Sequence, residues 1–302
     1  METRHSILSR QTGVLFLLPA LIFVSAFLLL PFIWVFILSF TNQTLLGANA
    51  ANVQFVGLRN YQRLIDFSQW LNPGQFGSSL IITAEFVLGS ALIGQAMLGL
   101  ALAWAFFRRK GILREFVYTL IILAWIIPEV VVAFGWVAFL DRDAGTLNLI
   151  LSHLGLDHPD WQLTYALPSI IIFNTWRGTA FSMLLFSSAL ATIPPSYLET
   201  AEVVGASAWQ KLRDIILPLL RGHILTDLIL ITLWTFNVFS PYLITNGGPA
   251  YRTEVVSIFT YRIAFQFFDF GRGAAIGVAV MLINLMLALV YLATLRRQAV
   301  YA

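Results

Sequence analysis

The amino-acid sequence predicts an all-α integral membrane protein with six transmembrane helices and both termini in the cytoplasm. Three observations support this fold class. Of the 302 residues, 59% are hydrophobic and only 11% are charged, whereas soluble domains carry about 25% charged residues. Six stretches stay apolar over about 20 residues, the length that an α-helix needs to cross a bilayer. Basic residues gather on one side of these stretches, as they do on the cytoplasmic side of membrane proteins.

The apolar stretches define the six predicted spans and leave no second domain. We treat residues 1–302 as a single transmembrane domain because no low-complexity linker divides them. Helices are expected because lipid cannot hydrogen-bond to an open strand. The first stretch is longer than the roughly 7–15 apolar residues of a signal peptide, so it is interpreted as an uncleaved span. The predicted spans lie at residues 13–40, 78–107, 115–140, 164–190, 223–245 and 273–295.

The orientation follows from the basic residues. With a cytoplasmic N-terminus, eleven of the eighteen lysines and arginines fall inside. The sharpest signal is the short loop 108–114, which carries four cations in seven residues. An even number of spans then places both ends in the cytoplasm. The net charge of +3 reflects this bias, so no nucleic-acid partner is expected.

Several classes of chemistry are excluded by composition. The chain has no cysteine, its four histidines are scattered, and it has no HExxH motif, so no metal site is expected. It also lacks the GxxxxGK[ST] loop that cradles nucleotide phosphates. An intramembrane enzyme has little support, since no paired aspartates or nucleophile motif lies within a span. We therefore predict no catalytic residues.

Residues 194–218 form the longest charged, amphipathic stretch of the chain. A Pro-Pro pair is predicted to end the fourth span, and Ser196 with Glu199 three residues later predicts a capping box. Pro218 is predicted to stop or kink the helix before the fifth span. Such a surface helix either connects two spans while lying on lipid headgroups or inserts into a groove of a soluble partner.

This segment resembles the signature loop of permease subunits of binding-protein-dependent ABC importers. The loop reads roughly E-A-A, three residues, G-A, and then I-x-L-P. Thr200 replaces the second alanine, Val204 replaces an acidic residue often found before the glycine, and Leu212 stands where an aromatic residue is common. The residues that match in register are Glu199, Ala201, Gly205, Ala206, Ile215, Leu217 and Pro218.

The resemblance extends over nearly the whole chain. FVGLRNYQRL, after the first span, resembles the periplasmic segment of these permeases. LTYALPSIIIFNTWRGTAF resembles the fourth span of carbohydrate-type permeases. TFNVFSPYLITNGGPAYRTEVVSIFTYRIAFQFFDFGRGAAIG is similar to their fifth span, outer loop and entry to the sixth span. The subfamily that it resembles includes the permeases of maltose and glycerol phosphate transporters.

The resemblance implies the type I ABC importer permease fold in a multi-pass protein of the bacterial cytoplasmic (inner) membrane. It implies a complex with a second homologous permease, two copies of a cytoplasmic ABC ATPase and an extracytoplasmic solute-binding protein. The solute would be a sugar, oligosaccharide, polyol or glycerol phosphate. ATP and Mg would bind to the ATPase, so this chain would bind no cofactor. The residues expected to couple to the ATPase are Glu199, Ala201, Gly205, Ala206, Leu212, Ile215 and Pro218.

Polar residues inside spans are default candidates for a substrate pathway. At about 1.5 Å per residue, Glu129, Arg177, Asn237 and Asn284 lie near the midplane. Glu129 and Arg177 could pair only to hold spans together, or Arg177 could face a cavity and bind hydroxyls or phosphate. Asn237 could bind sugar hydroxyls or form an interhelical hydrogen bond. The predicted pathway residues are Asn237, Ser240, Tyr242, Trp176, Arg177, Glu129 and Asn284.

Two alternatives stay open from the residues alone. Mid-span aromatic residues such as Trp176 and Trp234 could stack on a sugar ring or merely pack and face lipid. The chain could also be a secondary transporter or channel whose buried ionisable groups relay protons or ions. Those groups are Glu85, Glu129, Arg177 and Asp227. The signature segment favours the ATP-driven importer.

Overall fold

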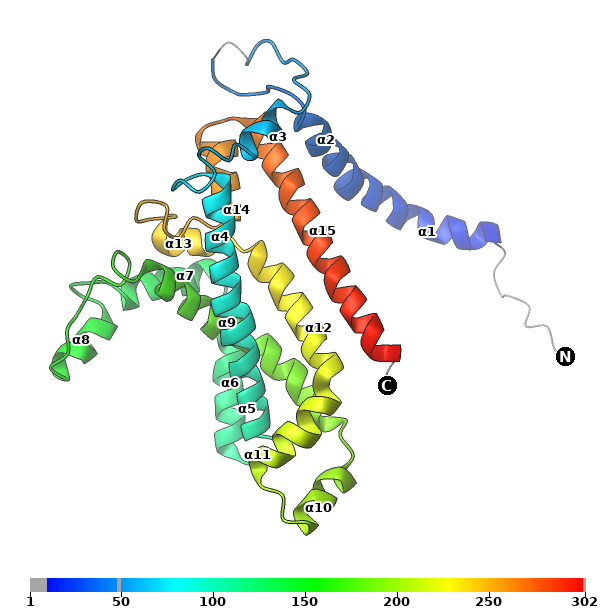
Figure 1. The fold of residues 1–302 in the computed structure, drawn as a ribbon, viewed down its shortest axis with the longest axis vertical. Coiled ribbons are helices and arrows are strands. Elements are labelled where there is room, and N and C mark those ends of the chain that lie inside the picture. Colours follow the sequence, from blue (N-terminus) through cyan, green and yellow to red (C-terminus); the bar gives the residue numbers. More distant parts are fainter. Residues whose placement is uncertain (1–9, 48–49, 301–302) are drawn as a thin grey trace. The chain divides into compact units, whose positions relative to one another are not determined.

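The computed structural model describes the backbone of residues 10–47 and 50–300 and the side chains of residues 14–47 and 50–294. The two termini, predicted to be cytoplasmic, fall outside these ranges. The chain divides into unit 1, residues 1–66 and 260–281, and unit 2, residues 67–259 and 282–302. The regular elements of the described part are helices joined by loops (Figure 1), and its only β-pairing is two isolated bridges, Thr41 with Phe55 and Thr44 with Asp269.

Unit 1 contains the first apolar helix. It is formed in succession by α1 (Arg10–Val24), the π-helical η1 (Ser25–Leu29) and α2 (Leu30–Leu38). None of the side chains from Val14 to Leu38 is buried within the described residues, which suits a helix that faces lipid or a partner. The buried amide of Asn60 in α3 (Arg59–Leu64) donates to the carbonyls of Ser39 and Thr41, at 2.9 and 2.8 Å. Unit 1 also holds η4 (Arg262–Gln266) and the first turns of α15 (Phe270–Val300).

Unit 2 is a bundle arranged around α9 (Ala166–Ala191). A 30-residue helix, made of α4 (Phe76–Phe86), η2 (Val87–Gln95) and α5 (Ala96–Ala105), runs beside α9 (Figure 1). α6 (Ile112–Ile126) and α12 (Leu217–Phe236) also pack on α9. One core cluster surrounds Phe173, and the other surrounds Met183 and Phe186. α9 therefore carries the core of this unit.

Glycines in η2 and α5 bring this helix close to the backbone of α9. A Cβ added to Gly99 would lie 2.5 Å from the Cβ of Ser182 and 2.8 Å from the backbone nitrogen of Met183. A Cβ at Gly94 would overlap the side chain of Thr175. Small residues allow such close approach between membrane helices, where packing drives association.

We expect Gly99→Ala to destabilise the folded chain by about 1–3 kcal/mol, because the backbone of α9 must move to admit the methyl group. Gly222→Ala in α12 is the matched control, since a Cβ there meets no described atom within 4 Å. Thermal unfolding in detergent, followed by tryptophan fluorescence, measures both. Equal midpoints for the two variants would contradict the close α5–α9 contact.

The third predicted span is not one straight helix. α6 and α7 (Glu129–Phe139) are bent by 106° at the break between them. Pro128 disfavours a helical conformation in the residue before it, and Ile127 has an extended ψ of 136°. The prediction of one helix over residues 115–140 was wrong at this proline.

The fifth predicted span is displaced relative to residues 223–245. α11 (Ala208–Lys211), the π-helical η3 (Leu212–Ile216) and α12 form a single helix, Ala208–Phe236. Pro218 therefore does not stop the helix, so the first of the two predicted effects, a stop or a kink, was wrong. The π-helical turns just before it widen the backbone hydrogen-bond spacing, which accommodates a residue without an N–H. The helix ends at Asn237, and α13 (Pro241–Thr245) follows as a separate short helix.

In the described part of the chain, four helices are long and apolar enough to cross a membrane: Val14–Leu38, Phe76–Ala105, Ala208–Phe236 and Phe270–Thr294. Two bent pairs, α6 with α7 and α9 with α10 (Pro195–Val203), raise this number to six if each pair is one span. α9 alone has 26 residues, enough for a hydrocarbon core of about 30 Å. The short helices α8 (Thr146–His153) and α14 (Val256–Tyr261) lie between these spans in the sequence.

Candidate functional site

The charged segment 194–218 folds as two helices joined by a tight turn. Gly205, at the turn, has a φ of +76°. Its N–H donates to the carbonyl of Glu202 at 3.0 Å, and the N–H of Ala206 donates to the carbonyl of Ala201 at 2.9 Å. These two bonds form a Schellman motif, which needs a left-handed residue after the helix. Gly205 therefore ends α10 and redirects the chain toward α11.

The predicted capping box was assigned to the wrong helix. Ser196 lies inside α10, whose N-cap is Pro194 with no side-chain hydrogen bond. Pro195 starts α10 because its fixed φ and missing N–H suit the first helical position. A capping box instead begins α11, where Ser207 Oγ accepts from the N–H of Gln210 and Gln210 Oε1 accepts from the N–H of Ser207.

One face of the segment is anchored and the other is open. Leu198, Leu212 and Ile216 are buried in the core cluster around Met183 and Phe186. On the other face, Val203 is 88% exposed and Val204 is 76% exposed. Exposed apolar side chains on a charged helical segment are typical of a surface that binds a partner.

The predicted coupling residues fall into four structural positions. Leu212 is buried in the core, so it fixes the segment and offers no surface to a partner. Glu199 and Pro218 are exposed, and Gly205 makes the turn. Ala201, Ala206 and Ile215 line a cavity of 590 Å³ between the two helices, together with Ser196, Tyr197, Thr200, Val204, Gln210 and Asp214.

We expect Gly205→Val to destabilise the turn by about 1–2 kcal/mol, because a β-branched residue is strained in the left-handed conformation. Gly205→Asn is the control, since asparagine tolerates this conformation better. A Cβ at position 205 meets no described atom within 4 Å, so collisions do not add to the cost. Hydrogen exchange of the amides of α10 and α11 measures the effect. Equal protection of these amides in the two variants would contradict the predicted strain at position 205.

A second site lies among the helices of unit 2. It is a cavity of 330 Å³. Three aromatic rings form part of its wall: the centroid of the Phe181 ring lies 4.9 Å from that of Trp234 and 6.2 Å from that of Trp125. The amide of Asn174 is held by donating to Ser90 Oγ at 2.9 Å. The cavity is lined by Gln95, Trp125, Asn174, Arg177, Gly178, Phe181, Trp234, Thr235 and Val238.

Arg177 is the cation of this cavity and has one loose ionic partner. Its Nη1 lies 3.7 Å from Glu129 Oε1, with 23% of the Arg177 side chain and 36% of the Glu129 side chain exposed. Neither Arg177 Nε nor Glu129 Oε1 has a hydrogen-bond partner among the described residues. Glu129 lies in the first turn of α7, where the helix dipole favours a carboxylate. Arg177 therefore keeps donors for a ligand while its charge stays balanced.

The other predicted pathway residues do not line the cavity. Asn237 and Asn284 exchange hydrogen bonds of 3.2 and 3.1 Å between their side-chain amides, which is the interhelical bond considered as an alternative. Ser240 is buried, and its Oγ has no partner in the described part of the chain.

The two predicted aromatic pathway residues contact other rings. Tyr242 stacks on Phe239 at 4.9 Å, and Trp176 lies 5.7 Å from Trp136.

The cavity includes residues that sequence reasoning missed. Gln95 and Asn174 are amides within apolar stretches, so the rule that selected Asn237 could have found them. Nothing in the sequence distinguishes Trp125 and Phe181 as cavity residues, because aromatic residues are common in membrane helices.

Of the four ionisable groups proposed for a relay, Glu129 and Arg177 form an ion pair, but Glu85 and Asp227 are not connected to that pair among the described residues. Glu85 is exposed on α4. Asp227 is fully buried, and neither of its carboxylate oxygens has a hydrogen-bond partner among the described residues. In the same part of the chain, no hydrogen bond or ion pair links either residue to Glu129 or Arg177.

Known proteins share this architecture. Residues 95–300 match the family described as the binding-protein-dependent transport system inner membrane component. The chain is 31% identical over 291 residues to the trehalose/maltose transport system permease protein MalF of Thermococcus litoralis, covering 93% of this chain and 92% of that protein. It is 32% identical over 235 residues to the inner membrane ABC transporter permease protein YcjO of Escherichia coli, covering 76% of each.

Two further comparisons agree. The trehalose transport system permease protein SugA of Mycobacterium tuberculosis is 29% identical over 285 residues, covering 92% of this chain and 87% of that protein. A chain of a bacterial alginate ABC transporter, crystallised with an alginate pentasaccharide-bound periplasmic protein, superposes with a TM-score of 0.75 at 24% identity. The superposition covers 95% of this chain and 96% of that chain, and it shows a shared fold.

The chain therefore belongs to the family of inner membrane components of binding-protein-dependent transport systems. It is a multi-pass permease subunit of an ABC importer. The predicted family, all-α fold and membrane location are confirmed. The comparisons give no support to a secondary transporter or channel.

Proposed function

We propose that the chain forms half of the pore of an ATP-driven importer for a carbohydrate-type solute: a sugar, oligosaccharide, polyol or glycerol phosphate. The observation that carries the proposal is the open surface of segment 194–218, which is anchored from beneath by Leu198 and Ile216. Such a surface can receive a force from a soluble partner and pass it to the spans. The relatives named for trehalose and maltose support the solute class.

The proposed complex has four further subunits. A second homologous permease completes the pore, and two cytoplasmic ABC ATPases bind ATP and Mg and hydrolyse the nucleotide. A solute-binding protein delivers the solute from outside. Both termini and segment 194–218 lie in the cytoplasm, in agreement with the cations of loop 108–114. Transport proceeds by alternating access as the ATPases close.

Within the pore, Arg177 binds the solute. Its planar guanidinium can donate to two hydroxyls or to a phosphate, and Trp234 and Phe181 in the same cavity offer ring faces to a sugar. Five of the predicted pathway residues lie outside the cavity and extend the pathway beyond it. They are Trp176, Asn237, Ser240, Tyr242 and Asn284. The reciprocal bonds between Asn237 and Asn284 must open for their amides to reach solute hydroxyls.

The test uses the tagged chain isolated from its membrane with its partners and reconstituted in vesicles. Labelled trehalose, maltose and glycerol phosphate are offered with the binding protein outside and ATP at the ATPases. Uptake of a carbohydrate that requires both ATP and binding protein, and that resists a protonophore, is expected. Uptake that persists without ATP and collapses with the protonophore would overturn the proposal.

A further inference from the structure

Gln95 is a polar residue in the wall of the cavity that Arg177 lines, and it comes from a different span. It is the last residue of the π-helical η2, and π-helical turns are frequent at functional sites. Only 5% of Gln95 is exposed, and among the described residues no hydrogen bond joins its side-chain amide to another group. Leaving a buried amide unpaired is costly. A ligand in the cavity that pairs with this amide removes that cost.

The backbone of α9 determines where the amide of Gln95 lies. A Cβ added to Gly178 would overlap the amide carbon, oxygen and nitrogen of Gln95, so all three atoms lie across α9 at that glycine. Gly178 is about one turn from Asn174 and one turn from Phe181, and these residues also line the cavity. The amide is therefore held at the middle of the wall that α9 forms. Gly178 is its positioning residue, because a larger residue would occupy the same space.

A second amide in the wall is oriented by a chain of hydrogen bonds. Ser90 Oγ donates its one proton to the carbonyl of Phe86 at 2.7 Å, so it accepts from Asn174 Nδ2 at 2.9 Å. This orientation leaves Oδ1 as the acceptor that Asn174 offers to the cavity. A hydroxyl group can donate to this oxygen, whereas a fully ionised phosphate has only acceptor oxygens and would be repelled by it.

The remaining lining groups fit a neutral ring. Trp125, Phe181 and Trp234 offer flat apolar faces, which match the C–H face of a sugar ring better than an open-chain polyol. Glu129 Oε1 lies 3.7 Å from Arg177 Nη1, so the charge of Arg177 is already balanced. The cavity therefore matches a neutral molecule that has hydroxyl groups and an apolar ring face.

We propose that Gln95 is a specificity-determining residue of this cavity. Its amide hydrogen-bonds to a hydroxyl group of a neutral pyranose, which selects sugars and oligosaccharides over polyols and glycerol phosphate. The inference rests on the proposed import of a carbohydrate-type solute and narrows the class of that solute. A site whose amides pair with hydroxyl groups discriminates against any ligand that leaves those amides unpaired.

The test measures the binding of maltose, trehalose and glycerol phosphate by saturation-transfer NMR. It uses the chain isolated with its partners in detergent, without the solute-binding protein, so that only sites within the membrane complex are measured. At least one of the two sugars is expected to bind, and glycerol phosphate is not. Gln95→Ala should lower the sugar affinity about 2- to 12-fold, the effect of losing one hydrogen bond between neutral groups.

Gly178→Ala separates the binding role of Gln95 from its packing. The added methyl group should displace the amide, so this variant should lose as much sugar affinity as Gln95→Ala and should also unfold at a lower temperature. In Gln95→Ala/Gly178→Ala the shortened side chain leaves room for the methyl group. The thermal midpoint should then recover while the sugar affinity stays low. Recovery of both would mean that Gln95 only packs on α9.

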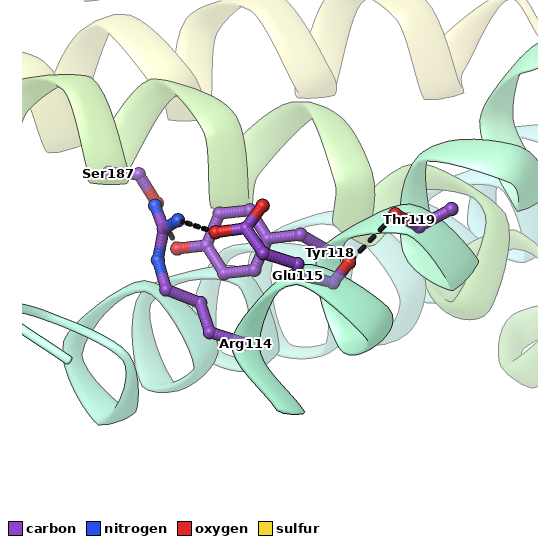
Figure 2. Close-up of polar contacts among 5 residues, drawn as sticks. All are labelled: Arg114, Glu115, Tyr118, Thr119 and Ser187. Carbon is purple, nitrogen blue, oxygen red and sulfur yellow. Dashed lines mark hydrogen bonds and ion pairs between the residues drawn. The ribbon is translucent and has the colours of Figure 1, made fainter. Parts of the chain in front are cut away.

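Ser187→Ala is the matched control for a polar contact of α9 outside the cavity. Ser187 Oγ shares a hydrogen bond of 2.7 Å with Tyr118 Oη of α6 (Figure 2), and neither residue lines the cavity. The substitution should lower the thermal midpoint and leave the sugar affinity unchanged. A weaker sugar affinity in this variant would mean that binding responds to any loosening of α9.

Three further outcomes would overturn the inference: displacement of the bound sugar by glycerol phosphate, an unchanged affinity in Gln95→Ala, and no binding of either sugar. ATP-dependent carbohydrate uptake by vesicles, together with unchanged binding in Gln95→Ala, would remove this role and leave the proposed importer in place. Sugar binding that depends on Gln95, together with uptake that collapses with a protonophore, would contradict only the ATP-driven importer.

Discussion

Replacing Glu199 with lysine is expected to abolish ATP-driven uptake while the chain still folds and inserts. Glu199 is exposed on α10, whereas its neighbour Leu198 is buried and holds the helix in place. The substitution therefore changes the proposed docking surface and leaves its anchor intact. Disrupting a charge contact in a buried interface costs about 2–5 kcal/mol, or roughly 30- to 5000-fold in affinity. Recovery of the ATPase with the tagged chain and uptake by vesicles measure the loss.

The matched control for Glu199 is Asp143→Lys. Asp143 is an exposed acidic residue in the loop between α7 and α8, away from segment 194–218 in the sequence. The same change of charge there should leave both ATPase recovery and uptake unchanged. Normal uptake by the Glu199→Lys chain would remove α10 from the proposed docking surface.

Replacing Arg177 with glutamine is expected to reduce uptake roughly 10- to 150-fold, the loss of one charge-assisted hydrogen bond of about 1.5–3 kcal/mol. Arg177 lines the cavity with 23% of its side chain exposed, so its guanidinium can bind a solute. The single substitution also leaves Glu129 without its ionic partner, so the thermal midpoint should fall.

A double-mutant cycle separates the two roles of Arg177. Glu129→Gln/Arg177→Gln removes both charges, so the thermal midpoint should recover relative to Arg177→Gln alone. Uptake should stay low, because the donor to the solute is still missing. Recovery of uptake in the double variant would mean that the pair only joins α7 to α9 and that Arg177 does not bind solute.

Long apolar stretches predicted where the membrane helices lie, but hydropathy carries no information on breaks within them. Pro128 ended α6, whereas Pro218 lies within a continuous helix because η3 precedes it. The same residue type thus had opposite effects, set by the backbone hydrogen bonds of the preceding turn. Apolar content cannot distinguish these cases, because the residues around both prolines are equally apolar.

The resemblance selected the coupling residues but could not assign their separate roles. Leu198 and Leu212 are buried, while Val203 and Val204 are exposed, although all four are aliphatic. Which side of segment 194–218 is buried is determined only by the packing of α10 against the ends of α9 and α12. The Asn237–Asn284 pair illustrates the same limit, since an isolated asparagine in a span does not reveal its partner.

The glycine contact between α5 and α9 has a mechanical consequence. Because the two helices are in close contact at Gly99, α5 and α9 should move together as one rigid body. Leu198 and Ile216 connect α10 and η3 to the end of this rigid body that holds Met183 and Phe186. Gln95 and Arg177 lie farther along the same helices. A displacement of α10 should therefore reach the cavity wall as a rigid rotation, with little lost to local deformation.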